Sequence, residues 1–242
     1  DLAKTIKIFY ETFANKKTQP ALILKTSGAT YSIIDREDCL KKINYVKNMF
    51  PKDWRLPNVY LLHGSLSNEE MNYLYNHPKC KAFVSFTHGE GFGRPLLEAT
   101  MTGLPVIATK WSGHLDFLDE RYSVLVSGNM TKVPQSMVWK DIIIDQAQWF
   151  NVNETEAGKA LSYVFNNHKE VKNNAKKLMK VNREKFTLNK MTEKFTEIVD
   201  GLNLSEVVDL KLPKLTKVKK GEPSNEKSPI KLPKLKKVTE AV

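Results

Sequence analysis

Apolar residues follow two spacings along the first half of the chain. Short apolar runs predict strands at residues 21–26, 58–62, 82–86, 106–109 and 123–126. Helical spacing between the runs predicts helices at residues 1–13, 37–49, 68–75 and 95–102. Strands alternating with helices of this length predict an α/β fold. Its core is a Rossmann-like parallel sheet with helices on both faces.

Local signals support three of these helices. In the first, apolar residues form one stripe: Leu2, Ile6, Phe9, Tyr10 and Phe13. Ser67 followed by Glu70 predicts a capping box at the start of helix 68–75. Pro95 at the first helical position and Gly103 just past the end delimit helix 95–102.

The second half of the chain has a different organisation. Residues 127–150, with Trp139 and Trp149, read as a loop-rich insertion packed on the domain. Residues 153–202 read as helical throughout, ending in a helix at 187–202. We therefore expect one domain at residues 1–203.

Residues 204–242 form a separate basic tail. Ten lysines and five acidic residues give it five of the chain's net +11 charges, and the segment 211–218 recurs in similar form at 231–238. Its many lysines and prolines predict disorder. The tail could bind an anionic membrane surface or nucleic acid, or serve as a linker or partner-docking segment.

The glycine-rich turn after strand 82–86 carries the clearest chemistry. Gly89, Gly91 and Gly93 lead into a helix, and a helix N-terminus offers unpaired N–H groups and partial positive charge to an anion. Glu90 and Glu98 bracket the turn, so both carboxylates could face one pocket at the carboxyl end of the strand. This arrangement predicts a site for a phosphorylated sugar or a nucleotide-sugar.

Other interpretations of the same residues remain open at this point. Glu98 could simply complement the helix dipole, and Glu90 could be a solvated turn residue. A dinucleotide site fits poorly, because it wants G-x-G-x-x-G and an acidic residue about 20 positions on. Here the glycines alternate, and Lys110 and Trp111 follow the next strand.

The block from Glu90 to Glu98, continuing through Gly103 to Ala108, resembles the E-x7-E signature of GT-B glycosyltransferases of the retaining family-4 type. The resemblance covers roughly residues 1–203 and corresponds to the donor-binding, C-terminal domain of that fold. It implies transfer of a hexosyl group from a nucleoside-diphosphate sugar, with retention.

The resemblance also implies roles for individual residues. Glu90 would contact the transferred sugar as the catalytic residue, and Glu98 would hold the ribose hydroxyls of the nucleotide. The remaining donor contacts that it implies are backbone contacts to the sugar and amides near the diphosphate: Gly91, Phe92, Gly93, Leu96 and Leu97.

Two further positions differ from the family's usual residues. Arg94 replaces an aliphatic residue, and its guanidinium could reach a phosphate or remain at the surface. Residues 112–116 take the place of a second glycine turn, in which Gly113 would contact the donor. Ser112 stands where a glycine is common, and Asp116 takes the place of the acidic residue that this turn often carries in the family.

No cofactor or metal is expected. His63, His88 and His114 are spread over different loops without a metal-ligand spacing such as H-E-x-x-H, and relatives of this kind need no metal. The donor base should be selected by loops 28–36 and 64–70, which carry no readable code. The acceptor, whether glycan, lipid or protein, is not encoded here.

The chain opens inside the helix that follows the first strand of such a domain. We therefore expect it to be a fragment, with the N-terminal acceptor domain and a basic pair for the diphosphate lying upstream. Lys4 and Lys7 are predicted to lie on the solvated face of helix 1–13 rather than to replace that pair.

Alternative functions share the fold. A catalytically incomplete GT-B domain could act as a binding module tethered by its tail, and a GT-B epimerase is conceivable. A phosphorylase would need a pyridoxal-phosphate lysine, and none is identifiable. Cys39 and Cys80 give no disulfide framework, so we expect a cytoplasmic protein, with the tail offering a peripheral membrane contact.

Overall fold

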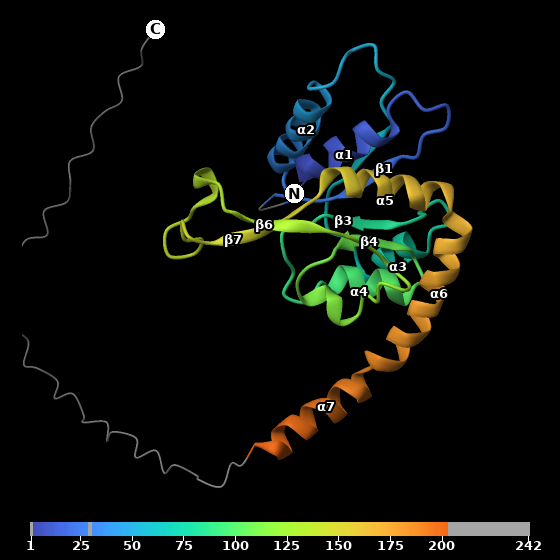
Figure 1. Ribbon diagram of the computed structural model, residues 1–242, viewed down its shortest axis with the longest axis vertical. Helices are drawn as coiled ribbons and strands as arrows, with labels where there is room; N and C mark the ends of the chain where they lie inside the picture. Colours follow the sequence, from blue (N-terminus) through green and yellow to red (C-terminus); the bar gives the residue numbers. More distant parts are fainter. Residues whose placement is uncertain (1, 29–30, 203–242) are drawn as a thin grey trace, which may run out of the picture. The chain divides into compact units, whose positions relative to one another are not determined.

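The computed structural model describes residues 2–28 and 31–202 (Figure 1). The chain divides into residues 1–198 and 199–242, and the sheets and the site described below lie within the first of these units. The expected disordered tail, 204–242, lies outside the described residues.

The core of the unit is a three-stranded parallel sheet. Its strand order is β3 (Phe83–Ser85), β4 (Val106–Thr109) and β5 (Val124–Val126), with β4 paired on both sides. All four residues of β4 are buried. Since successive side chains point to opposite faces, Ile107 packs in one apolar cluster while Val106 and Ala108 pack in the other.

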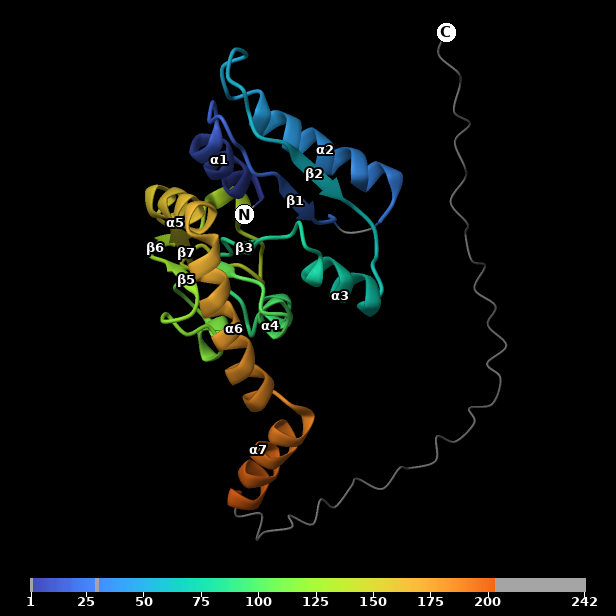
Figure 2. The ribbon, with the colours of Figure 1, turned by 90° about the vertical axis from the view of Figure 1, so that its right-hand side faces the viewer.

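Helices cover both faces of this sheet. One cluster joins β4 to α1 (Leu2–Phe13), α2 (Ile33–Lys47) and α5 (Glu154–Asn166), and α1 packs along α5. The other joins it to α3 (Asn68–Asn76), α4 (Arg94–Met101) and α6 (His168–Lys185), with α6 lying against α4 (Figure 2). The predicted α/β class, with helices on both faces of a parallel sheet, is confirmed here.

A second parallel pair, β1 (Leu22–Lys25) and β2 (Val59–Leu62), forms its own small sheet. Leu24 and Leu61 point into the cluster with α1 and α2, whereas Ile23 and Tyr60 are 46% and 55% exposed. Within the described residues no ladder joins β1 to β3. The sheet is therefore interrupted in the described part of the chain, and the face of β1–β2 that carries Ile23 and Tyr60 is exposed.

The predicted capping box forms at the start of α3, whereas the N-cap of α2 was not predicted. Ser67 accepts from the Glu70 amide and Glu70 reaches back to the Ser67 amide, which completes the capping box. Helix α2, predicted to begin at residue 37, begins at Ile33. Ser32 caps it by accepting from the Asp35 amide at 3.1 Å.

The loop-rich insertion expected at 127–150 is wrong in part, because its ends pair as strands. β6 (Gly128–Lys132) and β7 (Gln148–Val152) form an antiparallel hairpin, in register from Gly128–Val152 to Lys132–Gln148, and it projects from the sheet in Figure 1. A Cβ on Gly128 would lie 2.0 Å from the Asn151 carbonyl oxygen, so this close approach requires glycine.

Lys4 and Lys7 stay partly exposed on α1, and each also has a partner that the sequence did not indicate. Lys4 donates to the Asn151 side chain at 2.8 Å, and Lys7 pairs with Glu154 at 2.5 Å at the start of α5. Lys4 thus ties α1 to β7 of the hairpin, and Lys7 ties α1 to the start of α5.

The helical stretch at 153–202 is confirmed as three helices: α5, α6 and α7 (Leu188–Gly201). In the described part of the chain, no helix combines the length and the apolar character that crossing a bilayer would need.

Candidate functional site

Gly93 ends the glycine-rich turn after β3 and lets the chain enter helix α4. This residue is the N-cap of α4 in the left-handed region, with φ 85°, and a Cβ there would lie 3.1 Å from the Cβ of His114. A larger residue would therefore be strained and crowded at once. Helix α4 begins at Arg94, so Pro95 occupies its second position rather than the first.

The turn at residues 112–116 is hydrogen-bonded to the glycine-rich turn at residues 89–93, and Ser112 makes two of these bonds. The Ser112 hydroxyl accepts from the Glu90 amide at 3.0 Å and donates to the Glu90 carbonyl at 2.7 Å. The Gly113 amide donates to the same carbonyl at 3.0 Å. Three hydrogen bonds thus fix the backbone of Glu90.

Position 113 must be glycine because its backbone packs closely against the glycine-rich turn at residues 89–93. A Cβ at this position would lie 2.0 Å from the Gly91 carbonyl oxygen and 2.9 Å from that of Glu90. Gly113 was predicted as a donor contact, and its neighbours here are the backbones of Glu90 and Gly91. It therefore shapes the turn that carries Glu90.

Glu90 and Glu98 line the same cleft, as their positions around the turn predict. The cleft measures about 1930 Å³ and opens between β1 and β3, with Gly93, Arg94 and Leu96 also in its wall. The far side carries residues of both loops expected to select the base: Tyr31, Ser65, Leu66 and Asn68.

Glu98 has two neighbours. Arg94 pairs with it at 3.0 Å between Nε and Oε1, and the Tyr75 hydroxyl donates to Oε2 at 3.4 Å. Burial, and then the charge of Glu98, raise the pKa of Tyr75 to about 12, so this hydroxyl stays a donor at neutral pH. Arg94 is exposed, and an exposed ion pair of this kind is worth about 0–1 kcal/mol, so an anionic ligand could compete for the guanidinium.

The start of α4 lies in the wall of the cleft, which includes Leu96 but not Leu97. The amides of Leu96 and Leu97 donate to the Gly93 carbonyl at 2.9 and 3.1 Å. Their predicted contact with a diphosphate would therefore share or replace these bonds. The helix N-terminus itself still presents partial positive charge to this end of the cleft.

Phe92 belongs to an aromatic group rather than to the cleft wall. Its ring lies 5.2 Å from that of Phe117 and 6.2 Å from that of Phe186, at the end of α6. This side chain anchors the turn to the helical layer, and its backbone remains the part predicted to contact sugar.

The hairpin supports the same turn, which little in the sequence indicates. The His88 ring stacks on Trp149 at 4.0 Å, and its Nδ1 pairs with the Phe150 carbonyl at 2.7 Å. Burial lowers the pKa of His88, so the imidazole is neutral at physiological pH. The apolar pair Trp149–Phe150 was the available signal, but it carries no information on its partner.

The family of the chain can now be stated. The profile described as "Glycosyl transferases group 1" matches residues 4–146, more than half of the chain and including both glutamates. The chain belongs to this family. No curated protein matches it in sequence.

Solved structures of group 1 and related glycosyltransferases share the fold. Anabaena HepE in complex with UDP-glucose superposes with a TM-score of 0.56 at 15% identity, over 84% of this chain and 46% of that one. Sucrose-phosphate synthase from Thermosynechococcus elongatus gives 0.55 at 15% identity, over 85% and 44%. The C-terminal domain of the group 1 protein LpcC from Francisella tularensis gives 0.52 at 16% identity, over 77% and 80%.

The extent of these matches locates the group 1 chain within the GT-B fold. It spans less than half the length of HepE and of sucrose-phosphate synthase, but most of the separate C-terminal domain of LpcC. The expectation of a GT-B C-terminal half is thereby confirmed.

Proposed function

We propose that this chain is the donor-binding part of a glycosyltransferase that transfers a hexosyl group from a nucleoside-diphosphate sugar, with retention and without a catalytic metal. The observation that carries the proposal is the common cleft of Glu90, Glu98 and the N-terminus of α4. A carboxylate suits sugar hydroxyls, and a helix N-terminus suits a diphosphate.

In this proposal each group keeps one task. Glu98 accepts hydrogen bonds from the ribose, with Tyr75 holding its second oxygen. Arg94 leaves Glu98 for the diphosphate, whose departing charge is also stabilised by the helix N-terminus. Glu90, fixed by Ser112 and Gly113, orients the transferred sugar.

The choice of nucleotide to test first comes from the structural neighbours. HepE has been crystallised with UDP, with UDP-glucose, and with UDP and glucose. UDP and UDP-glucose are therefore the leading ligands, with GDP and ADP as comparisons.

Calorimetric titration of the 242-residue chain tests the proposal. At least one of the three nucleoside diphosphates should bind. Glu98→Gln should weaken that binding roughly tenfold to a hundredfold, because a hydrogen bond to a charged group is worth about 1.5–3 kcal/mol. Glu184→Gln, an exposed change on α6, is the matched control and should leave binding unchanged.

Glu90→Gln separates the roles of the two glutamates. It should spare the affinity for the bare nucleotide and reduce the additional affinity for the matching nucleotide-sugar. If nucleotide binds but Glu90→Gln affects neither ligand, the alternative of a nucleotide-binding module without sugar transfer is favoured. If no nucleotide binds, or Glu98→Gln has no effect, the donor-site proposal is wrong.

A further inference from the structure

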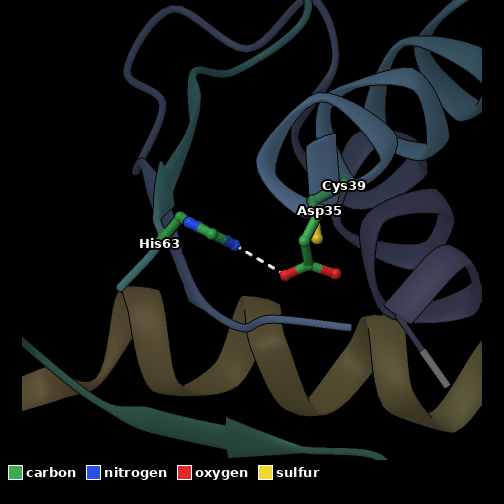
Figure 3. A group of neighbouring side chains, drawn as sticks. All are labelled: Asp35, Cys39 and His63. Carbon is green, nitrogen blue, oxygen red and sulfur yellow. Dashed lines mark hydrogen bonds and ion pairs between the residues drawn. The ribbon is translucent and has the colours of Figure 1, made fainter. Parts of the chain in front are cut away.

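Three side chains with different metal-binding atoms meet at the edge of the β1–β2 sheet: Asp35, Cys39 and His63 (Figure 3). Asp35 and Cys39 lie one turn apart on α2 and so share a face of the helix. His63 follows the last residue of β2 and points at Asp35. One carboxylate oxygen, one sulfur and one imidazole nitrogen lie within 4.8 Å of one another.

The three groups are well shielded from water. The side chains of His63 and Asp35 are 5% and 12% exposed, and Cys39 as a whole is 4% exposed. His63 Nε2 lies 2.7 Å from Asp35 Oδ2. Such shielding favours a resident ion over a loosely bound one, because a buried cation is lost more slowly to solvent.

A further contact already orients the carboxylate. The Gly28 amide donates to both oxygens of Asp35 at 2.9 Å. Ligating carboxylates in metal proteins are commonly held by such outer hydrogen bonds. Two carboxylate oxygens offer about four lone-pair sites, so the bonds to Gly28 leave room for a metal bond.

We propose that Asp35, Cys39 and His63 bind a thiophilic divalent cation of the zinc type, with water in the fourth position. Thiolate and imidazole ligands favour zinc over calcium or magnesium, which prefer oxygen. A thiolate and a carboxylate together balance the charge of the ion, and the thiol proton passes to solvent on binding.

The geometry needs only small movements. Tetrahedral zinc with bonds of about 2.0–2.3 Å places its ligand atoms roughly 3.4–3.6 Å apart. The His63–Asp35 distance of 2.7 Å would lengthen by roughly 1 Å. Ligand atoms that lie as far apart as 4.8 Å would approach by roughly 1 Å, and side-chain rotation can supply both movements. The bound ion would link the start of α2 to the end of β2. None of the three residues lines the donor cleft, so the proposal is independent of the proposed function.

Cobalt is the probe that reports on the sulfur. Titration of the reduced 242-residue chain with Co²⁺ should show one ion per chain, visible bands of tetrahedral cobalt and a thiolate-to-cobalt charge-transfer band. Zn²⁺ should displace it. Cys39→Ser should abolish the charge-transfer band and weaken binding at least about tenfold, whereas Cys80→Ser, the other cysteine of the chain, should change neither.

Thermal unfolding gives a second readout that does not need Cys39→Ser to fold. Stoichiometric Zn²⁺ should raise the Tm of the wild-type chain by a few degrees, and should raise that of His63→Gln by much less. The proposal is overturned if the wild-type chain shows no charge-transfer band, if the band persists in Cys39→Ser, or if Zn²⁺ leaves the wild-type Tm unchanged. Asp35 and His63 would then be a hydrogen-bonded pair beside a buried thiol.

Discussion

Ser112 occupies a backbone conformation that ordinarily belongs to glycine. Its φ of 82° and ψ of −171° lie where a Cβ is unfavourable, at a cost of about 1–3 kcal/mol. The hydroxyl gained in exchange bonds both the amide and the carbonyl of Glu90. Because this strained residue bonds directly to the backbone of the candidate catalytic glutamate, we infer that the strain serves to position Glu90.

Two substitutions at Ser112 separate strain from positioning. Ser112→Gly relieves the strain and Ser112→Ala keeps it, while both remove the hydroxyl. We expect the glycine variant to melt a few degrees higher than the alanine variant. Both should lose several-fold in affinity for the nucleotide-sugar and little for the bare nucleotide, as measured by calorimetry. Wild-type affinity for the nucleotide-sugar in Ser112→Gly would show that the hydroxyl does not position Glu90.

Tyr75 makes stability depend on alkaline pH. Burial and the charge of Glu98 raise its pKa from 10.0 to about 12, so the unfolded chain loses this proton first. The contribution of Tyr75 is complete below pH 10 and is lost as the pH rises to 12. By pH 11 about half of this contribution to the free energy of unfolding, on the order of 1 kcal/mol, is lost.

Urea unfolding at pH 9 and pH 11 measures this effect. The free energy of unfolding of wild-type protein should fall by about 1 kcal/mol more over this interval than that of Tyr75→Phe. Tyr73→Phe, on the same helix but 69% exposed, should behave like wild type. Equal pH dependence in all three proteins would show that Tyr75 titrates normally.

At the scale of elements, α6 holds the C-terminal end of α4 in place. The amide of Asn182, 1% exposed, donates to Thr100 Oγ1 at 2.9 Å and to the Phe117 carbonyl at 3.2 Å. Arg183 and Lys172 donate to the Met101 and Gly103 carbonyls at 2.8 Å each. These carbonyls lie at the end of α4, where no further turn can satisfy them.

Asn182→Ala should therefore destabilise the fold. It removes two buried donors and leaves a cavity, so we expect a loss of about 2–3 kcal/mol in the free energy of unfolding. Asn173→Ala, at an exposed position of α6, should change it by no more than about 0.5 kcal/mol. Denaturant titration of both variants checks this, and equal midpoints would contradict the buried role of Asn182.

Local signals predicted the elements that local chemistry determines. β4 has the predicted bounds, and the box at Ser67 and Glu70 forms as expected. The hairpin was missed because β6 and β7 pair across a long connection, which no short window of sequence reveals. The partners of Lys4 and Lys7 were missed for the same reason, since they lie 147 residues away in the chain.

The candidate site also has features that local spacing predicts and features that depend on tertiary packing. Spacing around the glycine turn was enough to predict that Glu90 and Glu98 share a cleft, because both positions follow one strand. The Ser112 clamp and the Tyr75 contact depend on tertiary packing, so the sequence alone could not indicate them. The donor contacts assigned to Gly91, Leu96 and Leu97 stay predictions.

At the scale of the whole unit, the interrupted sheet decides how the cleft of Glu90 and Glu98 is built. The carboxylates belong to the three-stranded sheet and its helices, whereas the opposite wall belongs to β1, β2 and the loops that follow them. A ligand that fills the cleft must therefore contact two pieces of sheet that no hydrogen-bonded ladder joins within residues 2–28 and 31–202.

That interruption has a consequence for hydrogen exchange. The amides of β4, paired on both sides and buried, should exchange slowest, and those of β1 and β2 should exchange sooner through openings that leave the three-stranded sheet intact. Nucleotide binding across the cleft should slow exchange in β1 and β2 toward the rate of β4. Mass spectrometry with and without UDP would then record two cooperative units becoming one, with the ligand supplying the coupling that the backbone lacks.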